Sequence, residues 1–340
     1  MRVMPTTFFD PIKLDVEERL DRGVALMKQN RFAEGIVEFE EVLKIDPTNF
    51  YAKWDRCWGL LSLGDYTNGM PNHDSAWERP FDHGLGSTLP VWQGERCRLI
   101  CYDNMGFGDG ILTLRFLPEI VRRCESVTLV AKPELVSLMR GHGANVVDRV
   151  PEDGSIFDAH VSMFNSIHIM GYTRETIPNK PYIKVDFKFS GGKMGIAWSG
   201  TTRKELDLSA FLSRLDTRGF ELYSLQKTCG GTHSVPEGSA LVLGQAGITP
   251  SPRELQVNDF KETAELMAIL DCIITVDTAA ANLAGAIGHP NAHVVMPYFR
   301  DWRWWYKDVW YPTLKIYPQY DANNWDGPFA RMNEAIHGSG

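Results

Sequence analysis

The sequence predicts an α/β protein: two doubly wound halves, each with a parallel sheet, preceded by a short all-α segment. Apolar runs of strand length alternate with helical stretches over residues 98–162 and again over 193–297. This alternation is typical of βαβ units, in which right-handed crossovers join parallel strands. Near the N-terminus, similar residues recur with a period of 34, which predicts paired helices there instead. A chain of 340 residues has room for two or three such domains.

Residues 1–79 form the predicted helical segment. Two repeats are too few to bury a core alone, because roughly three are needed, so we expect this segment to pack against the rest of the chain. The alternative is an ordinary four-helix cap with a chance period. The 34-residue repeat consists of the pairs Leu26 and Leu60, Asn30 and Gly64, Phe32 and Tyr66, and Gly35 and Gly69.

The two predicted α/β halves are residues 80–188 and 189–340. Folds of this kind bind ligands at the carboxyl ends of their strands, so the loops that follow strands are the places to search. The first half is expected to have strands at 98–102, 127–131, 146–147 and 156–162, with helices at 111–124 and 134–142. The second is expected to have strands at 193–198, 220–226, 239–244, 272–276 and 293–297, with helices at 209–215, 261–269 and 278–287.

Composition restricts the class of partner and the compartment. The formal net charge of −8 weakens the case for broad polyanion binding, although a local basic groove stays open. None of the six cysteines forms a C-x-x-C pair, so we expect a reduced, cytoplasmic protein without a metal site. No apolar run reaches the roughly 18 residues of a membrane span, and the N-terminus has no signal-peptide pattern.

The stretch 276–286, VDTAAANLAGA, is the most informative motif. It leads from a buried strand through an Asp-Thr turn into a small-residue helix, a geometry that aims backbone N–H groups and a helix dipole at an anion. Asp277 either caps the turn or accepts a hydrogen bond from a sugar hydroxyl, and Thr278 can donate to a phosphate. These features predict a small-molecule site at this edge.

Other loops of the second half carry groups suited to a nucleotide. The small, hydroxyl and basic residues after its first strand suit a diphosphate, and the alternative is a solvated loop. After the next strand, Gln226 can recognise a nucleobase edge and Lys227 can neutralise a leaving diphosphate, unless they form a plain polar cluster. Glu262 or Thr263 either contacts a ribose or caps its helix. The diphosphate loop would use Ser199, Gly200, Thr201 and Lys204.

A glycine-rich turn, Gly106–Gly110, follows the first strand of the first half. Its spacing differs from the dinucleotide fingerprint, because the third glycine comes one residue early. Through Gly106 and Gly108 the turn presents Asp109 at a helix N-terminus, where its carboxylate is either a general base or only a helix cap. His160, expected at the end of a strand, is either an acceptor-side group or a structural histidine.

Two further patterns bear on the chemistry. No D-x-D occurs in the chain, so metal-bridged diphosphate binding is not expected; Lys204, Lys227 and helix N-termini would stabilise a leaving phosphate. The run 298–311, YFRDWRWWYKDVWY, is dense in aromatic residues. It serves either as packing between parts of the chain, the reading we favour, or as a stacking platform for a sugar or base.

Taken together, the motifs resemble those of bacterial and phage-type tetratricopeptide-containing glycosyltransferases. The catalytic part of this family is related to the heptosyltransferases and distantly to O-GlcNAc transferase. The matching motifs cover nearly the whole chain in order: WERP at 77–80, GFGDGILTLRFLP at 106–118, ETIP at 175–178, IAWSG at 196–200, SLQK at 224–227, ITVDTAAANLAGAIG at 274–288, DWRWW at 301–305 and WYPTLKIY at 310–317.

The resemblance implies a GT-B fold, inverting chemistry without a metal, and no cofactor other than a nucleotide-sugar co-substrate, with UDP the expected nucleotide. It implies that Asp109 is the base and that the second half holds the nucleotide. The acceptor stays open among a polysaccharide, a protein and a modified nucleic acid, and the repeats are a candidate for self-association. Other hypotheses are an inactive tetratricopeptide adaptor and a nucleotide-sugar epimerase. The implied nucleotide residues are Gln226, Lys227, Thr263, Asp277, Thr278 and Ala279, with Asn282 where relatives usually carry His.

Overall fold

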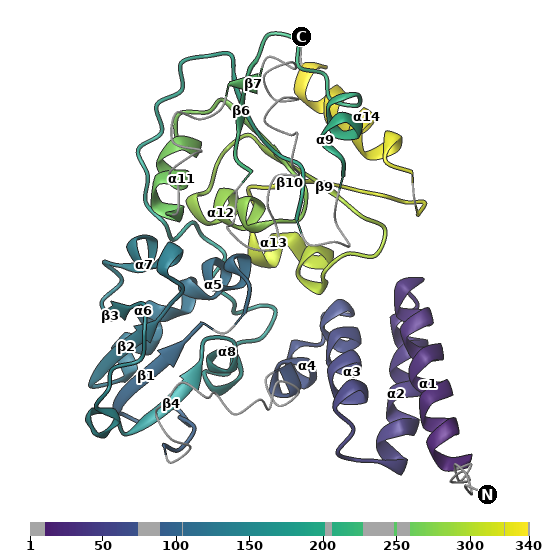
Figure 1. Cartoon of the computed structure of the whole chain (residues 1–340), viewed down its shortest axis with the longest axis vertical. Helices are drawn as coiled ribbons and strands as arrows, with labels where there is room; N and C mark the ends of the chain where they lie inside the picture. The colour runs from purple at the N-terminus through teal and green to yellow at the C-terminus, as the bar shows by residue number, and fades with distance from the viewer. Residues whose placement is uncertain are drawn as a thin grey trace, which may run out of the picture. The chain divides into compact units, whose positions relative to one another are not determined.

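The computed structural model describes residues 11–73, 89–103, 105–200, 206–226, 248–249, 259–322 and 324–338. The chain divides into two compact units (Figure 1). The first comprises Met1–Glu78 together with Asp301–Trp305, and the second comprises Arg79–Arg300 together with Tyr306–Gly340. A short piece of the aromatic run therefore belongs to the N-terminal unit, although it lies more than 200 residues away along the chain.

The first unit is all-helical, as expected for this segment. Each helix packs on the next, and close approach depends on small residues: a Cβ on Gly23 would lie 2.4 Å from Phe39, and one on Gly59 would lie 2.7 Å from Ile36. Asn49 caps the third helix by accepting from the Ala52 N–H at 3.0 Å. The helices are α1 (Pro11–Lys28), α2 (Phe32–Ile45), α3 (Phe50–Ser62) and α4 (Tyr66–His73).

Aromatic residues of the 301–305 segment complete the core of this unit. Trp302 is 1% exposed and meets the Tyr66 ring edge-on, with centroids 5.8 Å apart. Trp305 meets Phe32 in the same way at 5.3 Å. These tryptophans therefore serve packing, which is the interpretation that the sequence favoured for the aromatic run.

The second unit begins with a four-stranded parallel sheet in the order β3-β2-β1-β4. Apolar side chains fill its central strand, RLICY, in which four of five residues are buried. The strands are β1 (Arg98–Tyr102), β2 (Ser126–Val130), β3 (Asn145–Val147) and β4 (Ala159–Ser162). The helical elements are α5 (Phe107–Thr113), η2 (Leu114–Phe116), α6 (Leu117–Arg123), α7 (Pro133–Met139), η3 (Gly154–Ile156) and α8 (Asn165–Ile169).

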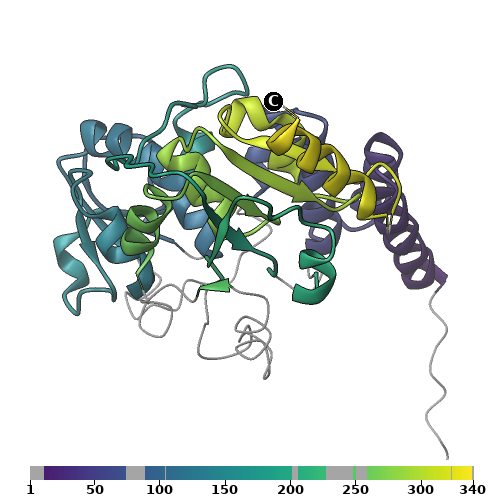
Figure 2. The ribbon, with the colours of Figure 1, turned by 90° about the horizontal axis from the view of Figure 1, so that it is seen from above.

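A six-stranded parallel sheet follows, in the order β10-β9-β8-β5-β6-β7. Its strands are β5 (Lys193–Ala197), β6 (Glu221–Ser224), β7 (Ile248–Thr249), β8 (Cys272–Thr275), β9 (Ala292–Met296) and β10 (Lys315–Pro318). Its helices are α9 (Leu208–Leu212), α11 (Phe260–Met267), α12 (Ala279–Ile287), α13 (Lys307–Trp310) and α14 (Asp326–His337), and η4 (Trp302–Tyr306) lies between β9 and α13. Figure 2 shows α14 lying along this sheet, where it contacts β9 and β10.

Strand order defines one crevice in each sheet. The first strand of each sheet, β1 or β5, lies between two others, with β2 or β6 on one side and β4 or β8 on the other. The order of the larger sheet is that of a doubly wound dinucleotide-binding fold, whose ligands lie outside the carboxyl ends of the strands where the winding reverses. The loops after β1, β5 and β8 stand at these two positions.

Parallel sheets, alternating helices and a helical N-terminal segment confirm the predicted α/β class. Several details were wrong: the helix expected at 111–124 is broken into α5, η2 and α6, and β10 and α14 were not predicted. The strand expected at 239–244 lies outside the described residues.

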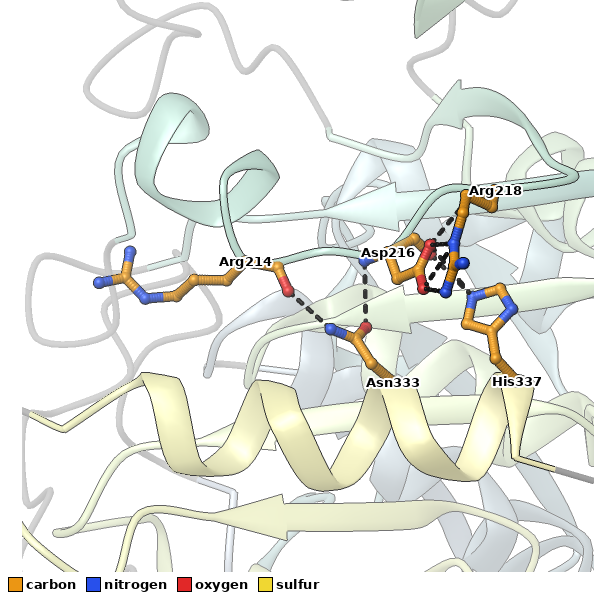
Figure 3. A network of polar contacts seen from close by, with 5 residues as sticks. All are labelled: Arg214, Asp216, Arg218, Asn333 and His337. Atoms are coloured by element: carbon orange, nitrogen blue, oxygen red, sulfur yellow. Dashed lines mark hydrogen bonds and ion pairs between the residues drawn. The ribbon is translucent and has the colours of Figure 1, made fainter.

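Polar contacts fasten the unpredicted helix α14 onto the turn between α9 and β6 (Figure 3). Asn333 accepts from the Asp216 N–H at 3.1 Å and donates to the Arg214 carbonyl at 2.7 Å. His337 lies 3.0 Å from the Asp216 carbonyl. Hydrogen bonds from Arg218 hold the pKa of Asp216 well below its usual range, so this carboxylate stays charged.

Candidate functional site

The loop after β1 contains a buried carboxylate that the sequence analysis missed. The Asp103 side chain is 3% exposed and forms an ion pair with Lys132, with Nζ 3.0 Å from Oδ2. Burial raises the pKa of Asp103 to about 6, against the opposing effect of Lys132. A signal was present in the sequence: a single acid directly after a buried strand, with a lysine after the next strand.

Asp109 lies in the first turn of α5, as predicted. Gly106 is the N-cap residue, and its N–H donates to Asp109 Oδ2 at 2.9 Å, which forms one half of a capping box. One carboxylate oxygen of Asp109 therefore accepts from the N-cap backbone, as the helix-capping interpretation predicted. The role of Asp109 as a general base stays a prediction.

In the second sheet, the loops after β5 and β6 are tied together by two predicted residues. The Ser199 N–H donates to Gln226 Oε1 at 3.0 Å, while Ser199 and Gly200 remain half-buried. Gln226 thus shapes the loop with its side-chain oxygen. Thr201, Lys204 and Lys227 lie outside the described residues.

The turn after β8 forms the N-terminus of α12. Thr278 is the N-cap: its hydroxyl accepts from the Ala280 N–H at 3.2 Å and lies 3.0 Å from the hydroxyl of Thr275. Asp277 is 6% exposed beside it, and Ala279 is the first helical residue. Every residue of α12 after Ala279 is buried, so its N-terminus is held firmly at the carboxyl edge of the sheet.

The structure brings the Asp109 loop and the start of α12 together. A Cβ on Gly108 would lie 2.7 Å from Asn282 Nδ2 and 3.6 Å from Ala279 Cα, so only glycine permits this approach. Beside it, the rings of Phe107 and Phe260 are 5.2 Å apart. Figure 1 shows α5 and α12 adjoining at the border of the two sheets.

Most polar side chains around the starts of α11 and α12 form hydrogen bonds within the protein. Asn282 donates to the Thr278 carbonyl at 3.0 Å and accepts from the Tyr311 hydroxyl at 3.1 Å. Thr263 lies on α11 and its hydroxyl donates to the Asp259 carbonyl at 3.2 Å. The N-cap of α11 is Asp259, whose side chain accepts from the Lys261 N–H at 2.7 Å, so Thr263 does not cap the helix. Ser137 of α7 hydrogen-bonds to the Asp259 side chain, which ties α7 to the start of α11.

His160 differs from its predicted position. It is the second residue of β4, and Ser162 stands at the carboxyl end, so the expectation of a strand-end histidine was wrong by two residues. Its ring stacks on Tyr102 with centroids 5.9 Å apart, and its Nδ1 lies 3.3 Å from the Tyr102 hydroxyl. Burial lowers the pKa of His160, so it is neutral near pH 7.

In the part of the chain that the structure describes, no group of three or more His, Cys, Asp and Glu residues could hold a metal ion. No described helix is long and apolar enough to cross a membrane.

Comparisons with known proteins gave only distant structural likenesses. No family model and no curated protein matches the sequence. The bacterial iron-containing dodecameric glycosyltransferase TibC from enterotoxigenic E. coli H10407 is 13% identical with a TM-score of 0.45, over 71% of this chain and 67% of that one. A Thermobaculum terrenum O-GlcNAc transferase mutant is 10% identical with a TM-score of 0.30, over 97% of this chain and 93% of that one.

A second TibC structure, described as an iron-containing heptosyltransferase in complex with ADP-D-beta-D-heptose, is 12% identical with a TM-score of 0.42 and covers 70% of this chain and 66% of that one. TM-scores below 0.5 are compatible with different arrangements of similar elements, so these likenesses decide neither fold nor function.

Proposed function

We propose that the protein is an inverting, metal-independent glycosyltransferase of GT-B architecture. Residues 80–188 are the acceptor half, 189–340 the nucleotide-sugar half, and 1–79 a tetratricopeptide-like segment. The observation that carries the proposal is the approach of the Asp109 loop to the start of α12 through Gly108. A carboxylate and a helix N-terminus suited to a diphosphate thereby adjoin at the carboxyl edges of two parallel sheets.

The donor lies along the edge formed by the ends of β5 and β8. Its diphosphate meets the first turn of α12, where the helix dipole favours negative charge. Asp277 accepts from the ribose, and Gln226 faces the base. Thr201, Lys204 and Lys227 complete the phosphate contacts in this proposal, with a UDP-sugar as the donor.

The transfer is a single displacement. The acceptor hydroxyl oxygen attacks the anomeric carbon on the face opposite the diphosphate, so the configuration inverts. The bond from this carbon to the diphosphate oxygen breaks, and the electron pair leaves with the nucleoside diphosphate. Asp109 takes the hydroxyl proton, and the N-terminus of α12 stabilises the charge of the leaving group. The acceptor is a hydroxyl of a glycan, a protein or a hydroxylated nucleobase.

Asp109→Asn tests the assignment of the base. Asparagine keeps an oxygen that can accept from the Gly106 N–H, so the capping box survives while the base is lost. We expect kcat for the release of nucleoside diphosphate from a sugar nucleotide to fall by about 10²–10⁴. The dissociation constant of the nucleoside diphosphate should stay unchanged.

The matched control is Asp308→Asn, whose carboxylate is 76% exposed and pairs with Lys307 on the surface. It should leave kcat unchanged. Full turnover by Asp109→Asn would refute the base assignment. Nucleotide binding without any turnover by the unmodified protein would favour the alternative, a catalytically inactive adaptor.

A further inference from the structure

A hollow lies between α7, α11 and the segment that precedes β5. Its volume is about 1150 Å³, and it is bounded by the end of α7 with the turn after it (137–142), by the segment 182–188 and by one face of α11 (261–269). We name it the back groove. Helices α7 and α11 pack side by side (Figure 1), and Ser137 near the end of α7 hydrogen-bonds to Asp259 at the start of α11.

The back groove combines an apolar floor with a basic rim. Leu138, Ile183 and Ala264 are buried beneath it. The basic side chains at its rim are exposed, and within the described ranges none of them forms an ion pair. They outnumber the carboxylates of the lining: Arg140, Lys184, Lys188 and Lys261 stand against Asp186 and Glu265.

The cations of the back groove, which form no ion pair within the described ranges, contrast with the rest of the molecule. The chain carries a net charge of −8, and its other arginines and lysines are often paired, as Arg98 is with Asp158 and Lys132 is with Asp103. Four cations around one hollow repel one another, and a bound anion removes this repulsion. The charge pattern therefore points to a negatively charged ligand.

The walls of the back groove are held in place by backbone hydrogen bonds. The Lys188 N–H donates to the Ala268 carbonyl at 2.9 Å, at the end of α11. The N–H groups of Tyr182 and Ile183 donate to the Ala286 carbonyl at 3.0 and 3.1 Å, at the end of α12. A groove fixed in this way needs little ordering on binding, which favours affinity for a small ligand.

We propose that the back groove binds an organic phosphate, with its apolar or aromatic body on the floor and its phosphates on the lysines of the rim. The volume of the groove slightly exceeds the roughly 300–1,000 Å³ of typical small-molecule pockets, so a ligand of nucleotide size fits. The same chemistry is offered by a soluble nucleoside polyphosphate and by the phosphate of a lipid headgroup. This site is independent of the proposed sugar transfer.

The test is calorimetric titration of the full chain with inorganic pyrophosphate and with ATP. Lys184→Gln/Lys188→Gln removes two exposed, unpaired cations and should weaken binding by about tenfold or more. Lys28→Gln/Lys44→Gln, on the helical unit, changes the net charge equally and should leave binding unaltered. A ligand bound at the donor edge instead would keep its affinity in Lys184→Gln/Lys188→Gln, which separates the two sites.

A second arm distinguishes the source of the phosphate. Co-sedimentation with phosphatidylcholine vesicles that carry phosphatidic acid, lost in Lys184→Gln/Lys188→Gln, would assign a lipid phosphate; calorimetric binding of ATP lost in that variant would assign a soluble one. The proposal is overturned if none of pyrophosphate, ATP and the phosphatidic acid vesicles binds, if Lys184→Gln/Lys188→Gln binds as the unmodified protein does, or if Lys28→Gln/Lys44→Gln weakens binding equally.

Discussion

Two carboxylates flank the turn after β1 and have different environments. Asp109 is half-buried and caps its own helix through one oxygen, whereas Asp103 is enclosed below it with Lys132. A Cβ on Gly110 would lie 2.6 Å from Asp103 Oδ2, so the helix presses on this carboxyl group. The charge of Asp109 adds to the effect of burial in raising the pKa of Asp103. Protonation of Asp103 is therefore linked to the charge of Asp109, the proposed base.

The raised pKa of Asp103 predicts a pH dependence of stability. The folded protein keeps this proton up to about pH 6, whereas the unfolded chain releases it near the ordinary aspartate pKa of 3.8. Between these values the folded state binds more protons, so the free energy of unfolding falls as pH rises, by up to about 3 kcal/mol from this group. Above pH 6 the contribution is constant.

Urea unfolding of the unmodified protein and of Asp103→Asn, measured between pH 4 and 7, checks this contribution. The difference between their unfolding free energies should change across the range and level off above pH 6. Asp321→Asn is at an exposed position, so its unfolding free energy should change with pH in the same way as that of the unmodified protein. If the unfolding free energies of Asp103→Asn and the unmodified protein differ by the same amount at every pH, the raised pKa of Asp103 is contradicted.

At the scale of elements, the contact between α5 and α12 holds the candidate site together. Gly108 permits it, and small residues continue the close packing along α12, where a Cβ on Gly285 would lie 2.3 Å from the Tyr311 ring. The sequence indicated both elements and their small residues. It could not indicate that Asn282 faces Gly108, because this contact joins segments about 170 residues apart.

Gly108→Ala should destabilise the protein by about 1–3 kcal/mol, because the new methyl group overlaps Asn282 Nδ2. The control is Gly327→Ala on α14, where a Cβ would lie 3.5 Å from Arg331, an ordinary contact. Adding Asn282→Ser to Gly108→Ala should recover part of the loss in a double-mutant cycle, measured by urea unfolding. Strict additivity of the two substitutions would argue against the contact.

At the scale of the molecule, a buried arginine joins distant parts of the second unit. Arg115 donates to the carbonyls of Leu112 at 3.0 Å, Pro178 at 3.0 Å and Trp310 at 2.8 Å. Its guanidinium also lies 4.7 Å from the centre of the Tyr311 ring. Arg115 thereby fixes η2 and the segment before β5 to the C-terminal aromatic run.

Arg115→Met should therefore cost about 3 kcal/mol or more, since it leaves buried carbonyl groups without a donor. Arg122→Met, which removes a surface arginine paired with Glu119, should cost about 0–1 kcal/mol. Urea unfolding of both variants checks the contrast. Equal losses would show that Arg115 is no more than a surface-like contact.

The parts that the sequence predicted are those with local signals. Alternating apolar runs indicated the strands from β1 to β9 apart from β7, and the Asp-Thr turn indicated the start of α12. The strand β10 follows a dense aromatic run that hid its pattern, and α14 has Gly and Pro in its first turn, which weaken a helix prediction. The contacts of Arg115 join residues far apart in the chain, which no local pattern encodes.

The central claim is that a nucleoside diphosphate binds where α12 meets the carboxyl edge of the larger sheet. A thermal-shift panel of UDP, GDP, ADP, CMP and TDP, each with magnesium and with EDTA, tests it most directly, since a ligand of the native state raises the melting temperature by mass action. We predict that one diphosphate nucleotide, UDP, stabilises the protein clearly more than the others, equally in EDTA, and that Lys184→Gln/Lys188→Gln keeps this shift. A panel without any shift would contradict the glycosyltransferase account.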